Sequence, residues 1–116
     1  MTPEAAKALY RRRIGVGEII YIRRYTGGGA NPPMYQAPVR ARVMGYDAEE
    51  LVGTIVQGDR KVIFLAEDLI SQQFALPITA NDKVVVRGKE LQIKSPDDST
   101  RRLQGQLIAF VLQVRG

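Results

Sequence analysis

The sequence predicts a mainly β protein: a small antiparallel β-barrel or sandwich of six or seven strands, with a short N-terminal helix and a long Gly/Pro-rich loop. The first observation is a tight hairpin pattern from Asn81 to Ser95. The second is that a two-stranded hairpin is marginal alone in water, so other strands must pair with it. We expect these strands from Arg60 to Ala66 upstream and from Gln106 to Arg115 downstream.

The hairpin pattern combines two strand-forming runs with turn chemistry. Val84 to Val86 are β-branched and favour a strand, and apolar and polar side chains alternate from Leu91 to Lys94. Between them we expect a two-residue turn at Gly88 and Lys89, of type II′ because glycine comes first.

The first 15 residues predict a short helix. Thr2 is a hydroxyl cap, Pro3 suits the first helical position and Glu4 suits the first turn. Arg11 to Arg13 fall in the last turn, where cations are favourable, and Gly15 ends the helix.

A strand at Glu18 to Tyr25 is followed by a long loop over residues 26–38, rich in glycine and proline. Prolines withhold backbone donors and glycines resist ordering, so we expect this loop to be mobile. Met34 and Tyr35 are more apolar than a loop that only connects two strands requires, which favours a binding surface that becomes ordered when it contacts a partner. A flexible hairpin connection without a role is the alternative.

The rest of the chain alternates strand patterns with turns. Val39 to Val43 alternate with arginines, which predicts a strand with one wet, basic face. Further expected elements are a hairpin of Leu51–Gln57 and Arg60–Ala66 around Gly58 and Asp59, a helical turn over Glu67–Ala75, a turn at Pro96–Ser99 and a last strand at Leu107–Val114.

Composition limits the classes of function. The 116 residues and 12.9 kDa suit one domain (1–116), and no apolar run is long enough for a membrane helix. The sequence has no cysteine and no histidine, so thiolate sites and histidine bases are excluded. We expect no enzymatic activity, no metal and no cofactor.

Positive charge is concentrated at the N-terminal end. Residues 1–46 carry eight Lys/Arg and two Glu, whereas residues 47–116 carry nine Lys/Arg and ten Asp/Glu. This end suits nucleic acid, an acidic protein surface or merely solvent. Tyrosines among these arginines, at Tyr21, Tyr25, Tyr35 and Tyr46, leave a small basic barrel that binds single-stranded nucleic acid as an alternative.

The order of these patterns resembles a known family. Val56 to Ile63, Asn81 to Lys89 and Leu107 to Gly116 follow a short helix, a strand and a Gly/Pro-rich loop. This order is similar to the small head–tail connector proteins of tailed bacteriophages and prophages, the group that includes the lambda head–tail joining protein. The resemblance covers nearly the whole chain and rests on turn and strand patterns.

The resemblance implies a structural virion protein that joins the portal side of the head to the tail. It implies a ring of copies of this chain, a hexamer or dodecamer, which contacts portal or head-completion proteins and tail proteins. The protein would contact DNA only as the DNA passes through the ring, or by weak non-specific binding. It would be located at the head–tail junction of the virion, and in the host cytoplasm before assembly. As partner-binding residues we predict Arg11, Arg12, Arg13, Arg23, Arg24, Tyr25, Gly28, Pro32, Pro33, Met34 and Tyr35.

Overall fold

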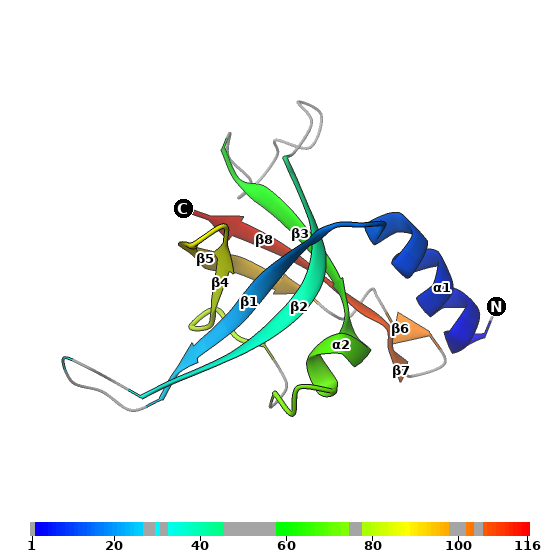
Figure 1. Ribbon diagram of the computed structural model, residues 1–116, viewed down its shortest axis with the longest axis horizontal. Coiled ribbons are helices and arrows are strands. Elements are labelled where there is room, and N and C mark those ends of the chain that lie inside the picture. Colours follow the sequence, from blue (N-terminus) through cyan, green and yellow to red (C-terminus); the bar gives the residue numbers. More distant parts are fainter. Residues whose placement is uncertain are drawn as a thin grey trace.

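A computed structural model describes residues 2–26, 30, 33–45, 58–74, 78–97, 102–103 and 106–116. Six antiparallel strands form a closed barrel in the order β1-β2-β3-β8-β5-β4, which confirms the mainly β prediction (Figure 1). The barrel strands are β1 (Glu18–Tyr25), β2 (Met34–Gly45), β3 (Arg60–Leu65), β4 (Lys83–Val86), β5 (Lys89–Asp97) and β8 (Ala109–Arg115). Outside the barrel are helices α1 (Pro3–Ile14) and α2 (Ala66–Ile70) and a small sheet of β6 (Arg102–Leu103) and β7 (Gln106–Leu107).

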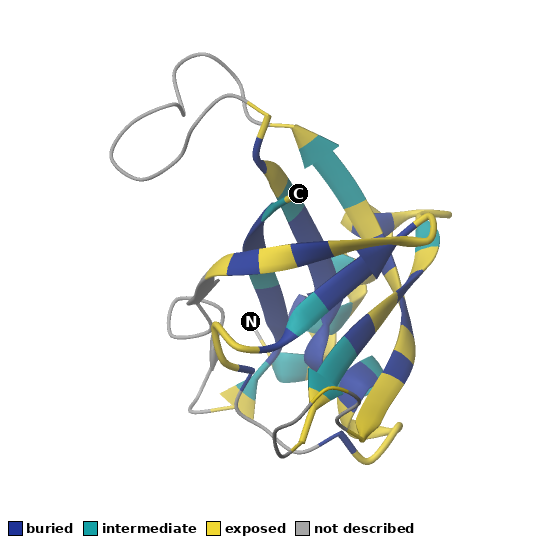
Figure 2. Ribbon diagram, turned by 90° about the vertical axis from the view of Figure 1, so that its left-hand side faces the viewer, coloured by how far each residue is buried: buried dark blue, intermediate teal, exposed yellow. Residues whose placement is uncertain are grey.

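The barrel interior is a continuous apolar core. Ile20 and Ile22 of β1 are fully buried, and Phe64 of β3 stacks on Phe110 of β8 with 5.3 Å between ring centroids. Buried and exposed positions alternate along much of β1 and β2, as the two-residue period of a strand predicts, whereas β3, β4 and β8 are buried along most of their length (Figure 2). Among the described residues, no helix is long and apolar enough to cross a membrane.

Helix α1 forms where the sequence predicts it. The Thr2 hydroxyl accepts a hydrogen bond from the Ala5 N–H at 3.1 Å, and Gly15 ends the helix with a φ of +63°. Ala6 and Ile14 pack, with outward-facing residues of β3, in a second apolar cluster outside the barrel. The helix therefore covers a sheet face that would otherwise expose apolar side chains to water.

Gly17 fixes the path from α1 into β1. Its φ is +55°, and a Cβ at this position would lie 2.5 Å from the Ala41 carbonyl oxygen. Only glycine tolerates both the backbone conformation and this close approach to β2.

The central hairpin forms, but its turn is one residue earlier than expected. The turn residues are Arg87 and Gly88, both with positive φ as in a type I′ turn, and Val86 pairs with Lys89. Moving a two-residue turn by one position shifts the pairing by two residues, so Leu91 pairs with Val84 instead of Val86. Leu91 therefore faces the barrel interior in both registers. Hydrophobic alternation therefore could not discriminate between them.

The hairpin's neighbours are only partly as expected. β5 pairs with β8, as predicted, but β4 pairs with β1 rather than with the upstream strand. β3 instead lies between β2 and β8, so both of its edges already have a partner strand. The expected hairpin around Gly58, in which Arg60–Ala66 would pair with the segment before it, is therefore wrong. The other arm, Leu51–Gln57, lies outside the described residues. The strand also ends at Leu65, since Ala66 begins α2, the short helical turn expected here.

The expected loop over residues 26–38 is too long, because β2 begins at Met34. Pro38 lies within the strand, opposite Tyr21. A proline is tolerated here because β2 pairs with β3 only from Ala41 onward, so Pro38 has a strand neighbour on one side alone. Of the predicted mobile loop, residues 27–29, 31 and 32 lie outside the described residues.

Two further boundaries near the C-terminus differ from the sequence prediction. Pro96 and Asp97, expected in a turn, extend β5 and pair with Leu112 and Val111. The expected last strand from Leu107 is divided between β7 and β8. The remainder of the expected turn, residues 98–99, lies outside the described part of the chain.

Candidate partner-binding site

The predicted partner-binding residues fall into two groups. Arg11, Arg12 and Arg13 occupy the last turn of α1, whereas six others gather where β1 ends and β2 begins. We call this second group the hairpin end; its members are Arg23, Arg24, Tyr25, Pro33, Met34 and Tyr35. Figure 1 places α1 and the hairpin end at opposite ends of the molecule. Gly28 and Pro32 lie outside the described residues.

The hairpin end is an ordered two-stranded ribbon with exposed apolar side chains. Tyr25 pairs with Met34 across the strands, and the Thr26 N–H donates to the Pro33 carbonyl at 2.9 Å. Tyr25, Met34 and Tyr35 are 39%, 48% and 42% exposed. Backbone pairing thus holds several large apolar side chains in contact with water. Soluble domains rarely expose such side chains in clusters.

Arg23 is neutralised on the outer face of the barrel. Its Nη1 donates to Glu90 Oε2 at 3.0 Å, and its Nε and Nη2 donate to Gln36 Oε1. The Tyr25 hydroxyl donates to the same Glu90 oxygen at 2.5 Å. The hydrogen bond from Tyr25, and then that from Arg23, outweigh burial and lower the pKa of Glu90.

Arg24 points to the opposite face of β1, where it contacts Asp82 and the core residue Phe74. Its Nε and Nη2 donate to the two carboxylate oxygens of Asp82, and the guanidinium lies 4.5 Å from the Phe74 ring centroid. The Tyr35 ring lies 5.5 Å from the same ring, and its hydroxyl donates to the Gln72 carbonyl. The hydrogen bond to Asp82 raises the pKa of Arg24 against the effect of burial. These contacts give Arg24 a structural role.

Of the three helix arginines, Arg11 ties α1 to α2. It lies 2.5 Å from Glu67 and 3.5 Å from Asp68, and Lys7 lies 3.3 Å from Glu67. Burial alone would raise the pKa of Glu67, but hydrogen bonds from Arg11 and Lys7 lower it. The neighbouring Arg12 and Arg13 are exposed and have no carboxylate partner among the residues that the structure describes.

Sequence reasoning missed two exposed features beside these groups. Ile19 and Tyr21 of β1 face outward and are 47% and 37% exposed. The sequence names Tyr21 only for the nucleic-acid alternative and does not single out Ile19, because both faces of β1 are apolar and alternation gives no signal. Arg40 and Arg42 of β2 were expected on a wet face and are exposed, but they were not assigned to a site.

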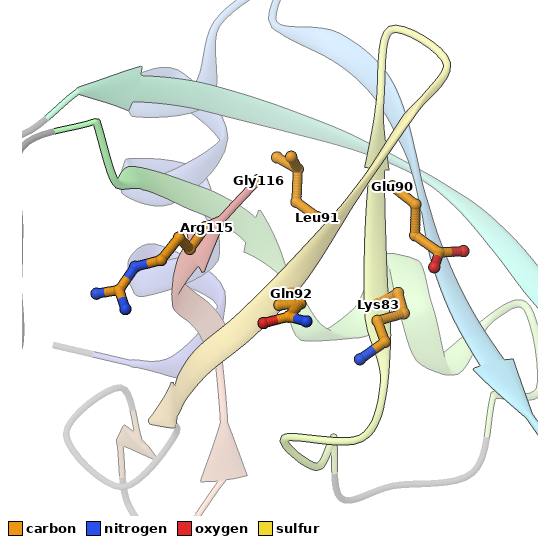
Figure 3. Close-up of a pocket in the computed structure, with 6 residues that line it drawn as sticks. All are labelled: Lys83, Glu90, Leu91, Gln92, Arg115 and Gly116. Atoms are coloured by element: carbon orange, nitrogen blue, oxygen red, sulfur yellow. The ribbon is translucent and has the colours of Figure 1, made fainter.

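A shallow pocket of about 310 Å³ lies beside the C-terminal end of β8 (Figure 3). Its lining residues are Lys83, Glu90, Leu91, Gln92, Arg115 and Gly116. The charged ends of Glu90 and Arg115 point away from each other, and Arg115 pairs with Asp59. Specific small-molecule sites have polar groups that converge, so this pocket is a poor candidate for one.

In comparisons with known proteins, no family model matches the sequence, and no curated protein matches it.

Proposed function

We propose that this protein is a structural assembly component that joins the head of a tailed bacteriophage to the tail as a ring of identical subunits. The observation that carries the proposal is the hairpin end, an ordered ribbon that presents Tyr25, Met34 and Tyr35 to solvent. Aromatic residues and methionine are enriched in protein interfaces, where their large apolar surfaces become buried.

Two unlike surfaces that lie apart on the molecule support a ring (Figure 1). The hairpin end is apolar and has its charges neutralised, whereas the last turn of α1 is rich in arginine. A head-to-tail ring requires each subunit to offer two different contact surfaces to its neighbours. The ring itself, the portal and tail proteins as partners, and the place at the head–tail junction come from the family resemblance.

A nucleic-acid-binding barrel is the alternative, and the hairpin end favours it less. Arg23 and Arg24 are paired with carboxylates, and the hydroxyls of Tyr25 and Tyr35 donate to protein acceptors. A basic groove with free aromatic platforms needs unpaired cations beside exposed rings. Tyr46 lies outside the described residues.

A charge placed on the hairpin end tests the proposal. Met34→Asp puts a carboxylate into the proposed interface, and Ile70→Asp makes the same change at a side chain of similar exposure on α2 (48% and 53%). We expect M34D to yield tailless heads and I70D to yield joined particles, as counted by electron microscopy of lysates. Equal joining by both folded variants would refute a role for the hairpin end.

A further inference from the structure

Four arginines outside the hairpin end lie where α1 ends against β2. Arg40 and Arg42 are exposed on the outer face of β2, and Arg12 and Arg13 are in the last turn of α1. Arg42 Nη1 donates to the Arg13 carbonyl at 3.1 Å, and Arg40 Nη1 donates to the Val16 carbonyl. We call Arg12, Arg13, Arg40 and Arg42 the arginine cluster.

The arginine cluster carries charge that nothing in the described chain neutralises. Arg40 and Arg42 use neutral backbone carbonyls as partners, which position the guanidinium groups and leave their charge intact. Every carboxylate whose side chain the structure describes already has another cation as partner: Glu4, Glu18, Asp59, Glu67, Asp68, Asp82 and Glu90. An anion for the cluster must therefore come from outside this part of the chain.

We propose that the arginine cluster binds the phosphodiester backbone of nucleic acid without regard to sequence. Each guanidinium offers a planar fork of donors that matches phosphate oxygens. Residues two apart on one strand face are separated by about 6.6 Å, so Arg40 and Arg42 form a short row of charges. A repeating polyanion, with a phosphate about every 3.4 Å along each strand, satisfies such a row better than one small anion does.

An acidic protein surface fits the same charges less well. Protein interfaces have an apolar centre with charges at the rim. Here the site consists of four arginines, and the exposed apolar side chains beside it are single residues, Val16 after α1 and Ile19 opposite Arg40 on β1. This binding surface is distinct from the hairpin end. It shares Arg12 and Arg13 with the last turn of α1 that the proposed ring uses, and the test below uses the isolated protein so that its outcome does not depend on ring formation.

The test measures the salt dependence of DNA binding by fluorescence anisotropy, with two labelled duplexes of unrelated sequence. Four phosphate contacts predict a slope of log affinity against log salt of about −3.6, and R40Q/R42Q should reduce it to about −1.8. At 50 mM salt the double variant should bind roughly a hundredfold more weakly. K89Q/K94Q is the matched control, because it removes the same charge from exposed positions on β5; its slope should equal that of the wild type.

Circular dichroism and thermal melting verify that the variants remain folded, and polyglutamate of matched charge serves as the carboxylate probe. The proposal is overturned if neither duplex binds at 50 mM salt, or if K89Q/K94Q loses as much affinity as R40Q/R42Q. It is likewise overturned if polyglutamate binds as tightly as DNA and is lost in the same variant, since the partner would then be an acidic protein.

Discussion

Arg24 Nε and Nη2 lie 2.8 and 2.7 Å from the two carboxylate oxygens of Asp82, in an ion pair that joins the end of β1 to the segment before β4. Asp82 is 1% exposed and also accepts the Thr79 N–H at 2.9 Å. One buried carboxylate therefore fastens the hairpin end to the central hairpin and orders the turn between them.

Asp82→Asn should destabilise the fold by about 2 to 3 kcal/mol, because it leaves a partly buried guanidinium without its counter-charge. The matched control is Glu18→Gln, which breaks the exposed pair with Arg87 and should cost about 0 to 1 kcal/mol. Urea denaturation of both variants checks the difference. Equal midpoints would show that the buried pair contributes no more than the surface pair.

Gly88→Val should destabilise the fold by about 1 to 3 kcal/mol through backbone strain alone. Gly88 has a φ of +81°, and a Cβ there would meet no atom within 4 Å, so no clash contributes. Arg87→Asn is the companion variant, because asparagine tolerates positive φ and suits the first position of a type I′ turn. Because this variant also loses the surface pair with Glu18, its free energy of unfolding, measured by thermal denaturation, should fall by no more than about 1 kcal/mol; a loss as large as that of G88V would contradict the turn assignment.

Ile93→Ala should cost about 2 to 5 kcal/mol, since Ile93 is buried in the barrel core and its removal leaves a cavity. Gln92→Ala, on the exposed side of the same strand, should change stability by about 0.5 kcal/mol or less. Guanidinium denaturation compares the two. A neutral I93A would mean that β5 presents its other face to the core.

Acid should weaken the link between the hairpin end and β5. The pKa of Glu90 in the folded protein lies below its ordinary value of 4.5, so the folded state binds fewer protons than the unfolded state. The resulting stabilisation is complete above about pH 4.5 and is lost as pH falls through the lowered pKa. Unfolding free energies measured from pH 7 to pH 3 should fall less steeply for Glu90→Gln than for the wild type. Parallel profiles would exclude Glu90 as a contributor.

Local signals in the sequence predict much of this fold. These signals lie within a few residues of the structure that they determine: Thr2 begins α1, Gly15 ends it, and the β-branched run at Val84 to Val86 forms β4. The barrel class follows from counting such segments. The turn at Arg87 was misplaced because two registers bury the same side chains, and arginine is an unusual residue at positive φ.

Strand order and the candidate site depend on distant parts of the chain. The partners Arg24 and Asp82 are 58 residues apart, and Arg23 and Glu90 are 67 apart, so the sequence alone could not show that these charges are neutralised. Nor could the sequence show that the arginines of α1 and those of the hairpin end lie far apart in the folded protein (Figure 1). The start of β2 was not predicted, because Pro38 is typical of a loop. Only the tertiary structure shows that one edge of the strand has no neighbouring strand at Pro38, so that a proline fits there.

Sedimentation velocity, with the purified protein alone and with tailless heads that carry the portal, tests the joining function most directly. We predict a monomer in isolation and co-sedimentation with heads as a ring at one vertex, because assembly should wait for a partner. Stable rings of the protein alone, or heads that sediment without it, would contradict the proposed function.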